Sequence, residues 1–402
     1  MSRPSLQVTS DRDRGGAGAL TRPYVVLAIA ASALAIAFQM TSLLWAHRGD
    51  PIAMIRQPKR DGVTQSPGFD GQFFLVIAKD PLIGPGTVVA LDSPLIRARR
   101  IGFPLAAWLL SHVTGGAASA LLVVVALSSL AVVWLLQASA ARDLVHPAFC
   151  LAVPLALPFV LSMELVTCEV MAAALLVAGA AAEKRRMPLL AATLIAAACL
   201  TKEVAVVAVL SFMVSHLCRG KLGRSAIYAA ATVPLALWNV YVAGSLGGAT
   251  RGGSLLANLT IPGVGLFGEL GATSVAIIRG GSVAKAAGVI LAISWLLVGA
   301  GLGSRLVLSK ITPARVLAFA SGVLVLLLSR GAPAYAYNEV FNFGRQLFLL
   351  PTGLAIVFFT ESRDLSLRTR TALAIWLVTG AALGVTWWGR TIWVLASVAG
   401  AG

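Results

Sequence analysis

The chain has 402 residues, 58% of them hydrophobic and only 12% charged, with a formal net charge of +16. The apolar content lies well above that of water-soluble globular proteins and the charge content well below it, which argues against a soluble fold. The basic residues stand at the ends of apolar runs and form no patch interleaved with aromatic side chains, which argues against a nucleic-acid surface. Attraction to anionic membrane lipids accounts for basic charge in this arrangement.

Apolar runs separated by short polar connectors predict an all-α, polytopic membrane helical bundle. A span needs about 20 mostly apolar residues, and the runs indicate about eleven transmembrane helices. Residues 1–23 should form a cytoplasmic N-terminal tail before an uncleaved first span, and residues 24–402 a single membrane domain. The predicted spans are residues 24–46, 117–140, 147–162, 169–182, 188–201, 204–218, 225–244, 285–304, 313–329, 346–360 and 371–390.

The connectors predict which ends of the spans share a side of the membrane. Residues 101–112 hold about a dozen apolar residues, too few to cross, so we expect an interfacial helix inside one long periplasmic loop, residues 47–116. If that helix crossed, every later connector would change side. With a cytoplasmic N-terminus, alternation satisfies the positive-inside rule, because it places in the cytoplasm the basic connectors at 142, 184–186, 219–224, 305–315 and 363–370.

The opposite, periplasmic side receives polar residues from five connectors. Moving a charge to bilayer depth costs about 2.5–3.5 kcal/mol, so each charged group should be paired or lie in a wet cavity. The residues are Asp70 and Gln72; Asp92, Arg97, Arg99 and Arg100; Glu164 and Glu169; Lys202 and Glu203; and Asn342 and Arg345.

Several of these residues have two interpretations. Asp70, which precedes a glycine, is either a turn residue or a carboxylate that accepts a proton from an incoming nucleophile. Lys202 either pairs with Glu203 or binds a lipid-linked phosphate as a point charge. Arg345 either snorkels to the interface or clamps an anion.

The remaining charges are also open to two interpretations. The arginines at 97–100 meet either lipid headgroups or a phosphorylated substrate, and Glu169 either complements a helix dipole or acts in a site. The four histidines and four cysteines show no metal-ligand spacing, so we expect no metal site.

Short motifs mark this polar face. They are FDGQFF (69–74), KDP (79–81), DSP (92–94), RRIGFPL (99–105), an acidic residue after the third span, LTKE (200–203) and NFGR (342–345). Together they resemble those of the polytopic C-type glycosyltransferases, the GT-C superfamily, especially bacterial members that use polyprenyl-phosphate sugars. The resemblance covers most of residues 24–220, which would form a GT-C-like module with a catalytic loop at 47–116. Residues 221–402 would be variable C-terminal helices.

The resemblance implies an inverting transfer from a polyprenyl-phosphate-linked sugar to a glycan or lipid acceptor at the periplasmic face of a bacterial inner membrane. Asp70 would be the catalytic base, and fixed cations would stabilise the leaving phosphate. No cofactor is expected, because the paired acidic motif of metal-dependent members is not evident after Asp70. The donor-binding residues would be Lys202, Arg345, Arg99, Arg100, Glu203, Gln72 and Asn342, and the secondary acidic residues Glu164, Glu169 and Asp92.

Two other functions remain open. A secondary transporter would show charges at both faces and often two matching repeats, whereas here the charges crowd one face and no convincing repeat is found. A lipid-binding assembly subunit of the envelope would leave Asp70 dispensable. Both predict that Asp70→Asn keeps activity, whereas a transferase would lose transfer and retain donor binding.

Overall fold

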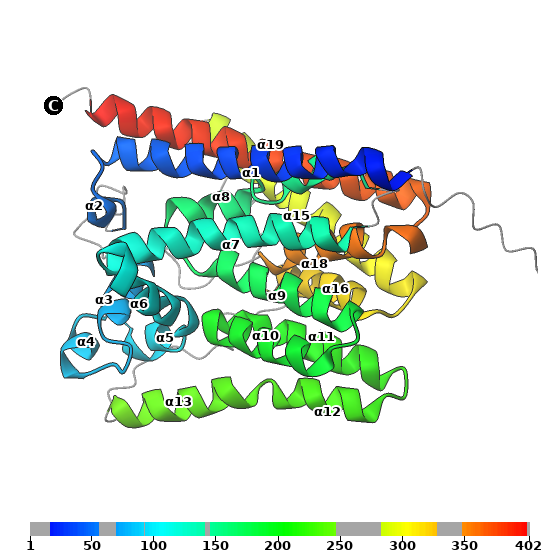
Figure 1. The fold of residues 1–402 in the computed structure, drawn as a ribbon, viewed down its shortest axis with the longest axis horizontal. Helices are drawn as coiled ribbons and strands as arrows, with labels where there is room; N and C mark the ends of the chain where they lie inside the picture. The colour runs from blue at the N-terminus through cyan, green and yellow to red at the C-terminus, as the bar shows by residue number, and fades with distance from the viewer. Residues whose placement is uncertain are drawn as a thin grey trace, which may run out of the picture.

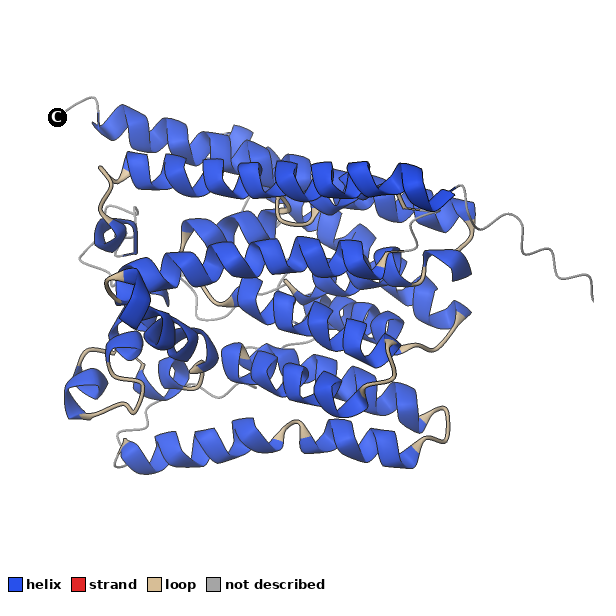
Figure 2. Cartoon of the chain, viewed as in Figure 1, coloured by secondary structure: helices blue, strands red, loops and turns tan. Residues whose placement is uncertain are grey.

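The computed structural model describes residues 17–55, 70–91, 93–140, 145–246, 283–327 and 348–399. The secondary-structure elements in these ranges are helices throughout (Figure 1; Figure 2). The long helices run side by side, and a group of short helices lies at one end of the bundle, on the left in Figure 1. The expected all-α class is confirmed for these residues.

Five stretches of helix within the described ranges are long and apolar enough to cross a membrane. Each has 20 to 27 residues, against the ~20 that a span needs. Their length and composition indicate a membrane protein. They are Pro23–Ala46 in α1 (Ala17–Ala46), α7 (Ala117–Ser139), Leu222–Ser245 across α12 (Leu222–Ala230) and α13 (Val233–Ser245), Ile290–Ser309 in α15 (Val283–Ser309), and Leu367–Trp393 in α19 (Leu367–Ala399).

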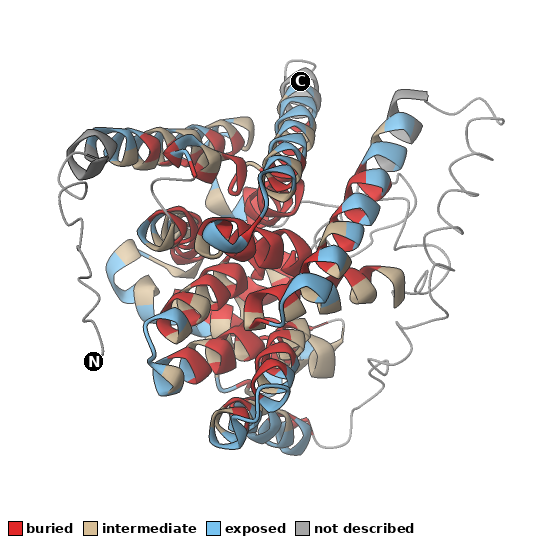
Figure 3. Cartoon of the chain, turned by 90° about the vertical axis from the view of Figure 1, so that its right-hand side faces the viewer, coloured by how far each residue is buried: buried red, intermediate tan, exposed pale blue. Residues whose placement is uncertain are grey.

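Shorter helices occupy the interior. They are α9 (Glu169–Lys184), α10 (Pro188–Thr201), α11 (Val206–Leu217), α16 (Pro313–Leu327) and α18 (Leu349–Thr360). Every residue of α18 from Leu349 to Phe359 is buried. Figure 3 shows buried residues concentrated in the middle of the bundle and exposed ones on its outer helices. A helix that is apolar all round is one that other protein segments enclose.

One predicted span is wrong as a single helix. Residues 147–162 form the 3₁₀ helix η1 (Pro147–Ala152) and then the short helix α8 (Leu157–Glu164). Pro154 lies between them, and a proline inside a helix favours a kink or a break, because it has no backbone N–H and its ring clashes with the preceding turn. Together η1 and α8 still carry the chain from the end of α7 to the opposite end of the bundle, where residue 165 meets Gly71.

The described parts of the predicted loop 47–116 contain five short helices. They are α2 (Pro51–Ile55), α3 (Asp70–Lys79), α4 (Pro85–Val89), α5 (Pro94–Ala98) and α6 (Gly102–Thr114). The 13 residues of α6 reach only ~20 Å, less than the ~30 Å of a bilayer core. It packs against α3 and α7 at the end of the bundle where the short helices gather (Figure 1).

Two glycines allow this group to approach the bundle closely. A Cβ on Gly71 would lie 2.7 Å from the carbonyl oxygen of Leu165, and one on Gly102 would lie 2.9 Å from the backbone nitrogen of Thr201. The start of α3 therefore touches the turn after α8, and the start of α6 touches the end of α10.

The basic connectors meet at the other end of the bundle. Lys184 Nζ, at the end of α9, donates to the carbonyl oxygens of Ser139 and Thr360 at 3.0 and 3.1 Å. Arg219 Nε donates to the carbonyl of Ile311 at 3.0 Å. Lys184 therefore joins the ends of α7, α9 and α18, and Arg219 joins the end of α11 to the α15–α16 connector.

We expect Gly71→Ala and Gly102→Ala to lower the midpoint of thermal unfolding in detergent. The added methyl group would meet backbone that cannot give way, and overpacking of this kind costs about 1–3 kcal/mol. Gly86→Ala is the matched control, because no atom lies within 4 Å of its Cβ position. Equal midpoints for the three variants would contradict the close approach.

Candidate active site

Two segments of the first loop meet around one carboxylate. Asp70 is the first residue of α3 and is buried. Its Oδ1 accepts a hydrogen bond from Arg97 Nη1 in the last turn of α5, and its Oδ2 lies 2.8 Å from Arg100 Nη1. The carboxylate thus lies between two guanidinium groups.

Arg100 also binds a second carboxylate. Its Nε and Nη2 donate to Oε2 and Oε1 of Glu203 at 2.9 and 2.7 Å. Glu203 begins η2 (Glu203–Ala205), which lies between α10 and α11. This two-point contact uses the planar geometry in which guanidinium and carboxylate groups match best. Arg100 therefore ties the first loop to the α10–α11 turn.

Opposite charges in this network favour the charged forms of Arg100 and Glu203. Burial would lower the pKa of Arg100, but the carboxylates of Glu203 and Asp70 outweigh burial and raise it. Burial would raise the pKa of Glu203, but Arg100 and Lys202 outweigh burial and lower it to about 2. The carboxylate of Glu203 is therefore ionised at neutral pH, because opposite charges nearby favour the charged form.

Lys202 belongs to a second, deeper pair. Its Nζ lies 2.9 Å from Glu169 Oε1, and both side chains are 0% exposed. Lys202 does not pair with its neighbour Glu203, which was one of the two interpretations that the sequence allows. The backbone at Lys202 is extended, with φ −149° and ψ 114°, and successive side chains of an extended chain point to opposite sides. Lys202 faces Glu169 in the bundle, and Glu203 faces Arg100 in the loop.

The other predicted site residues lie in different surroundings. Glu164 ends α8 and accepts a hydrogen bond from Thr391 of α19 at 3.3 Å. Gln72 lies half-buried in the first turn of α3. Arg99 is also half-buried, and its Nε has no hydrogen-bond partner among the described residues. Asp92, Asn342 and Arg345 lie outside the described residues.

Arg97 stands in the basic cluster that the sequence marks, but it is not among the donor-binding residues that the resemblance implies. Its guanidinium carbon lies 4.4 Å from the centroid of the Phe73 ring, and 18% of its side chain is exposed. The spacing of the arginines in the sequence could have identified Arg97, because residues three apart share one face of a helix. Arg97 and Arg100 have that spacing and both contact Asp70, whereas Arg99 does not.

We expect Lys202→Met to lower the free energy of unfolding by about 3–5 kcal/mol, because it removes the lysine that balances the buried charge of Glu169. Lys202→Met combined with Glu169→Leu should restore most of the stability, since it removes both buried charges. Lys310→Met is the control: its partner Asp364 is exposed, and such pairs contribute about 0–1 kcal/mol. The stability of all three variants is measured as the midpoint of thermal unfolding in detergent. Normal stability of Lys202→Met would contradict a structural role.

The arrangement combines the carboxylate of Asp70 with two arginines, the side chains that suit proton acceptance and recognition of a phosphate group. Among the described residues, no group of His, Cys, Asp and Glu side chains could hold a metal ion. Comparison of the chain with models of protein families, with curated proteins and with solved structures found no match.

Proposed function

We propose that the protein is a multi-pass membrane glycosyltransferase of the GT-C type, which moves a sugar from a polyprenyl-phosphate donor to a glycan or lipid acceptor. The observation that carries this proposal is the position of Asp70 between Arg97 and Arg100 in a group of short helices at one end of an apolar bundle. A base and phosphate-binding cations are then available next to the bilayer, where a lipid-linked donor lies.

The proposal assigns the bundle eleven passages in a bacterial inner membrane, with η1 and α8 together making one of them. The N-terminus and the basic connectors would be cytoplasmic, as the positive-inside rule requires. The end that holds α2 to α6 would be periplasmic. One observation supports this sidedness: the connectors that carry Lys184, Arg219 and Lys310 lie together at the end of the bundle opposite to Asp70.

The transfer would begin with an exchange of ion pairs. The donor phosphate competes with Asp70 for Arg97, whose guanidinium is partly exposed. Each guanidinium that leaves the carboxylate stops stabilising its charged form, so Asp70 becomes a stronger base when the donor binds. Donor binding and base activation are thereby coupled.

The proposed chemical step is a single displacement at the anomeric carbon. The acceptor hydroxyl oxygen forms the new bond to that carbon while its proton passes to Asp70. The bond between the anomeric carbon and the phosphate oxygen breaks, and the electron pair leaves with the polyprenyl phosphate. Arg97 and Arg100 stabilise the charge on the leaving phosphate. Attack opposite the leaving group inverts the configuration of the sugar.

The buried pairs would position these groups. Glu203 holds Arg100 from the side away from Asp70, and Lys202 with Glu169 fixes the α10–α11 turn that carries Glu203. In this proposal Lys202 is a positioning residue, and the phosphate contact that the resemblance implied for it passes to Arg97.

We expect Asp70→Asn to reduce transfer by about 10²–10⁴-fold, the contribution of a general base, while donor binding is retained. The transfer rate and the donor affinity are both measured with purified protein and labelled polyprenyl-phosphate hexoses and pentoses. Asp50→Asn is the matched control: Asp50 caps α2 in the same loop by accepting from the backbone N–H of Ile52, and asparagine caps equally well. A fully active Asp70→Asn variant would contradict the proposal and favour a non-enzymatic subunit.

We expect Arg97→Gln to raise the KM for the donor about ten-fold, since hydrogen bonds to charged groups contribute about 1.5–3 kcal/mol. Arg97→Lys should recover part of the loss, because it keeps the charge but not the planar geometry. Steady-state kinetics with varied donor at saturating acceptor separates KM from kcat. An unchanged donor KM in Arg97→Gln would rule out Arg97 as the phosphate contact.

A further inference from the structure

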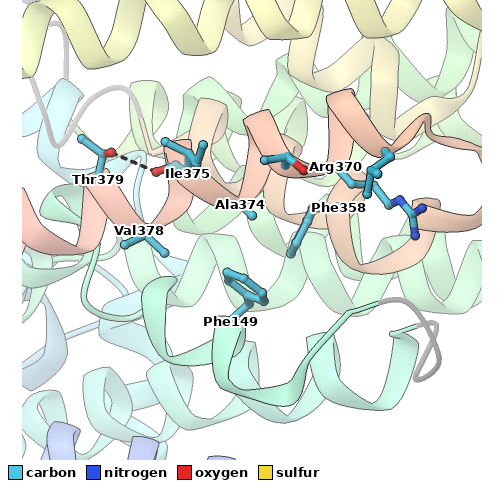
Figure 4. Close-up of a pocket in the computed structure, with 9 residues that line it drawn as sticks. Phe149, Phe358, Arg370, Ala374, Ile375, Val378 and Thr379 are labelled. Carbon is cyan, nitrogen blue, oxygen red and sulfur yellow. Dashed lines mark hydrogen bonds between the residues drawn. The ribbon is translucent and has the colours of Figure 1, made fainter.

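An apolar groove lies on the side of the bundle, towards the end that carries the basic connectors. It has a volume of about 490 Å³ and is formed by η1, the end of α18 and the first half of α19 (Figure 4). The rings of Phe149 and Phe358 meet edge to face, with centroids 5.6 Å apart. Ala374 and Val378 of α19 line the groove beside them.

The groove opens on a helix that can cross a membrane. Leu367, Ile375 and Val378 line it and are each at least half exposed, although α19 is one of the five membrane-spanning candidates among the described helices. Large apolar side chains exposed together mark a surface that another apolar group covers. In a bilayer, hydrocarbon chains surround this part of α19.

One end of the groove is cationic. Arg370, in the first turn of α19, lines it, and its Nε is buried with no hydrogen-bond partner among the described residues. The two acidic residues of the α18–α19 connector are already engaged: Glu361 binds Arg315 at 2.7 Å and Asp364 binds Lys310 at 2.6 Å. Arg370 therefore presents a buried donor at the mouth of an apolar groove.

The order of these groups along α19 matches that of a phospholipid. Residues four apart share one face of a helix, so Arg370, Ala374 and Val378 form a row, as Figure 4 shows. Eight residues of helix extend ~12 Å. The row therefore runs from a cation near the end of the bundle to an apolar wall two turns deeper.

We propose that this groove binds an anionic glycerophospholipid, with its phosphate at Arg370 and one acyl chain against Phe149, Phe358 and Ala374. Its volume falls within the ~300–1,000 Å³ of small-molecule sites. Basic pockets between transmembrane helices recognise anionic headgroups by the same combination of charge and hydrocarbon contact. The site lies at the opposite end of the bundle from Asp70 and does not rest on the proposed enzymatic function.

Native mass spectrometry of the detergent-purified full chain tests this site, with dioleoylphosphatidylglycerol and dioleoylphosphatidylcholine as probes. We expect the anionic lipid to bind about five-fold more tightly, which corresponds to the ~1 kcal/mol that one basic residue contributes. Arg370→Gln should abolish this preference and Arg370→Lys should keep it. Ala374→Phe, which fills the groove, should weaken the binding of both lipids.

Arg368→Gln is the matched control, because Arg368 lies in the same turn, is exposed and does not line the groove. It should leave the preference unchanged, and inorganic phosphate should not displace the lipid. Equal binding of both lipids by the wild type, or equal effects of Arg368→Gln and Arg370→Gln, would overturn the proposal. So would displacement by inorganic phosphate, which would indicate a simple anion site. Unchanged unfolding midpoints of the variants exclude misfolding as the cause.

Discussion

The contact on which the site depends is the one that Arg100 makes with two carboxylates. Its guanidinium binds Asp70 of the first loop and also Glu203 of the α10–α11 turn, which lies 103 residues after Arg100 in sequence. Loss of this side chain would remove the arginine that binds Glu203 and one of the two arginines that bind Asp70, and removing one member of a buried ion pair is far more costly than losing an exposed pair. The contact holds the group of short helices against the bundle and sets the geometry around Asp70.

Close backbone approach makes that contact possible. At Gly71 and Gly102 a side chain would collide with the turn after α8 and with the end of α10. Both glycines adjoin the charged network, one immediately after Asp70 and the other two residues after Arg100. The loop therefore needs small residues and ion pairs at the same points, because charges are well satisfied only when the segments that carry them are in contact.

The two ends of the bundle differ in chemistry. At one end, short helices surround a charged network in which Arg97 is partly exposed. At the other end, basic connectors are held by Glu361, Asp364 and backbone carbonyls. Basic connectors gathered at one end of an apolar helical bundle are the pattern that the positive-inside rule describes.

The sequence by itself determined the helical class and the helices that are long and apolar enough to span a membrane, and it marked Asp70, Arg100 and Glu203 as candidate site residues. Hydropathy and charge are local properties, so they can be seen in the chain without its fold. Only the tertiary structure decided that Lys202 pairs with Glu169, that Arg97 contacts Asp70, and that residues 147–162 form two helices. It alone places Arg370 beside Phe149 and Phe358. Each of these depends on the direction of a side chain or on packing between segments far apart in the chain, which composition and periodicity do not encode.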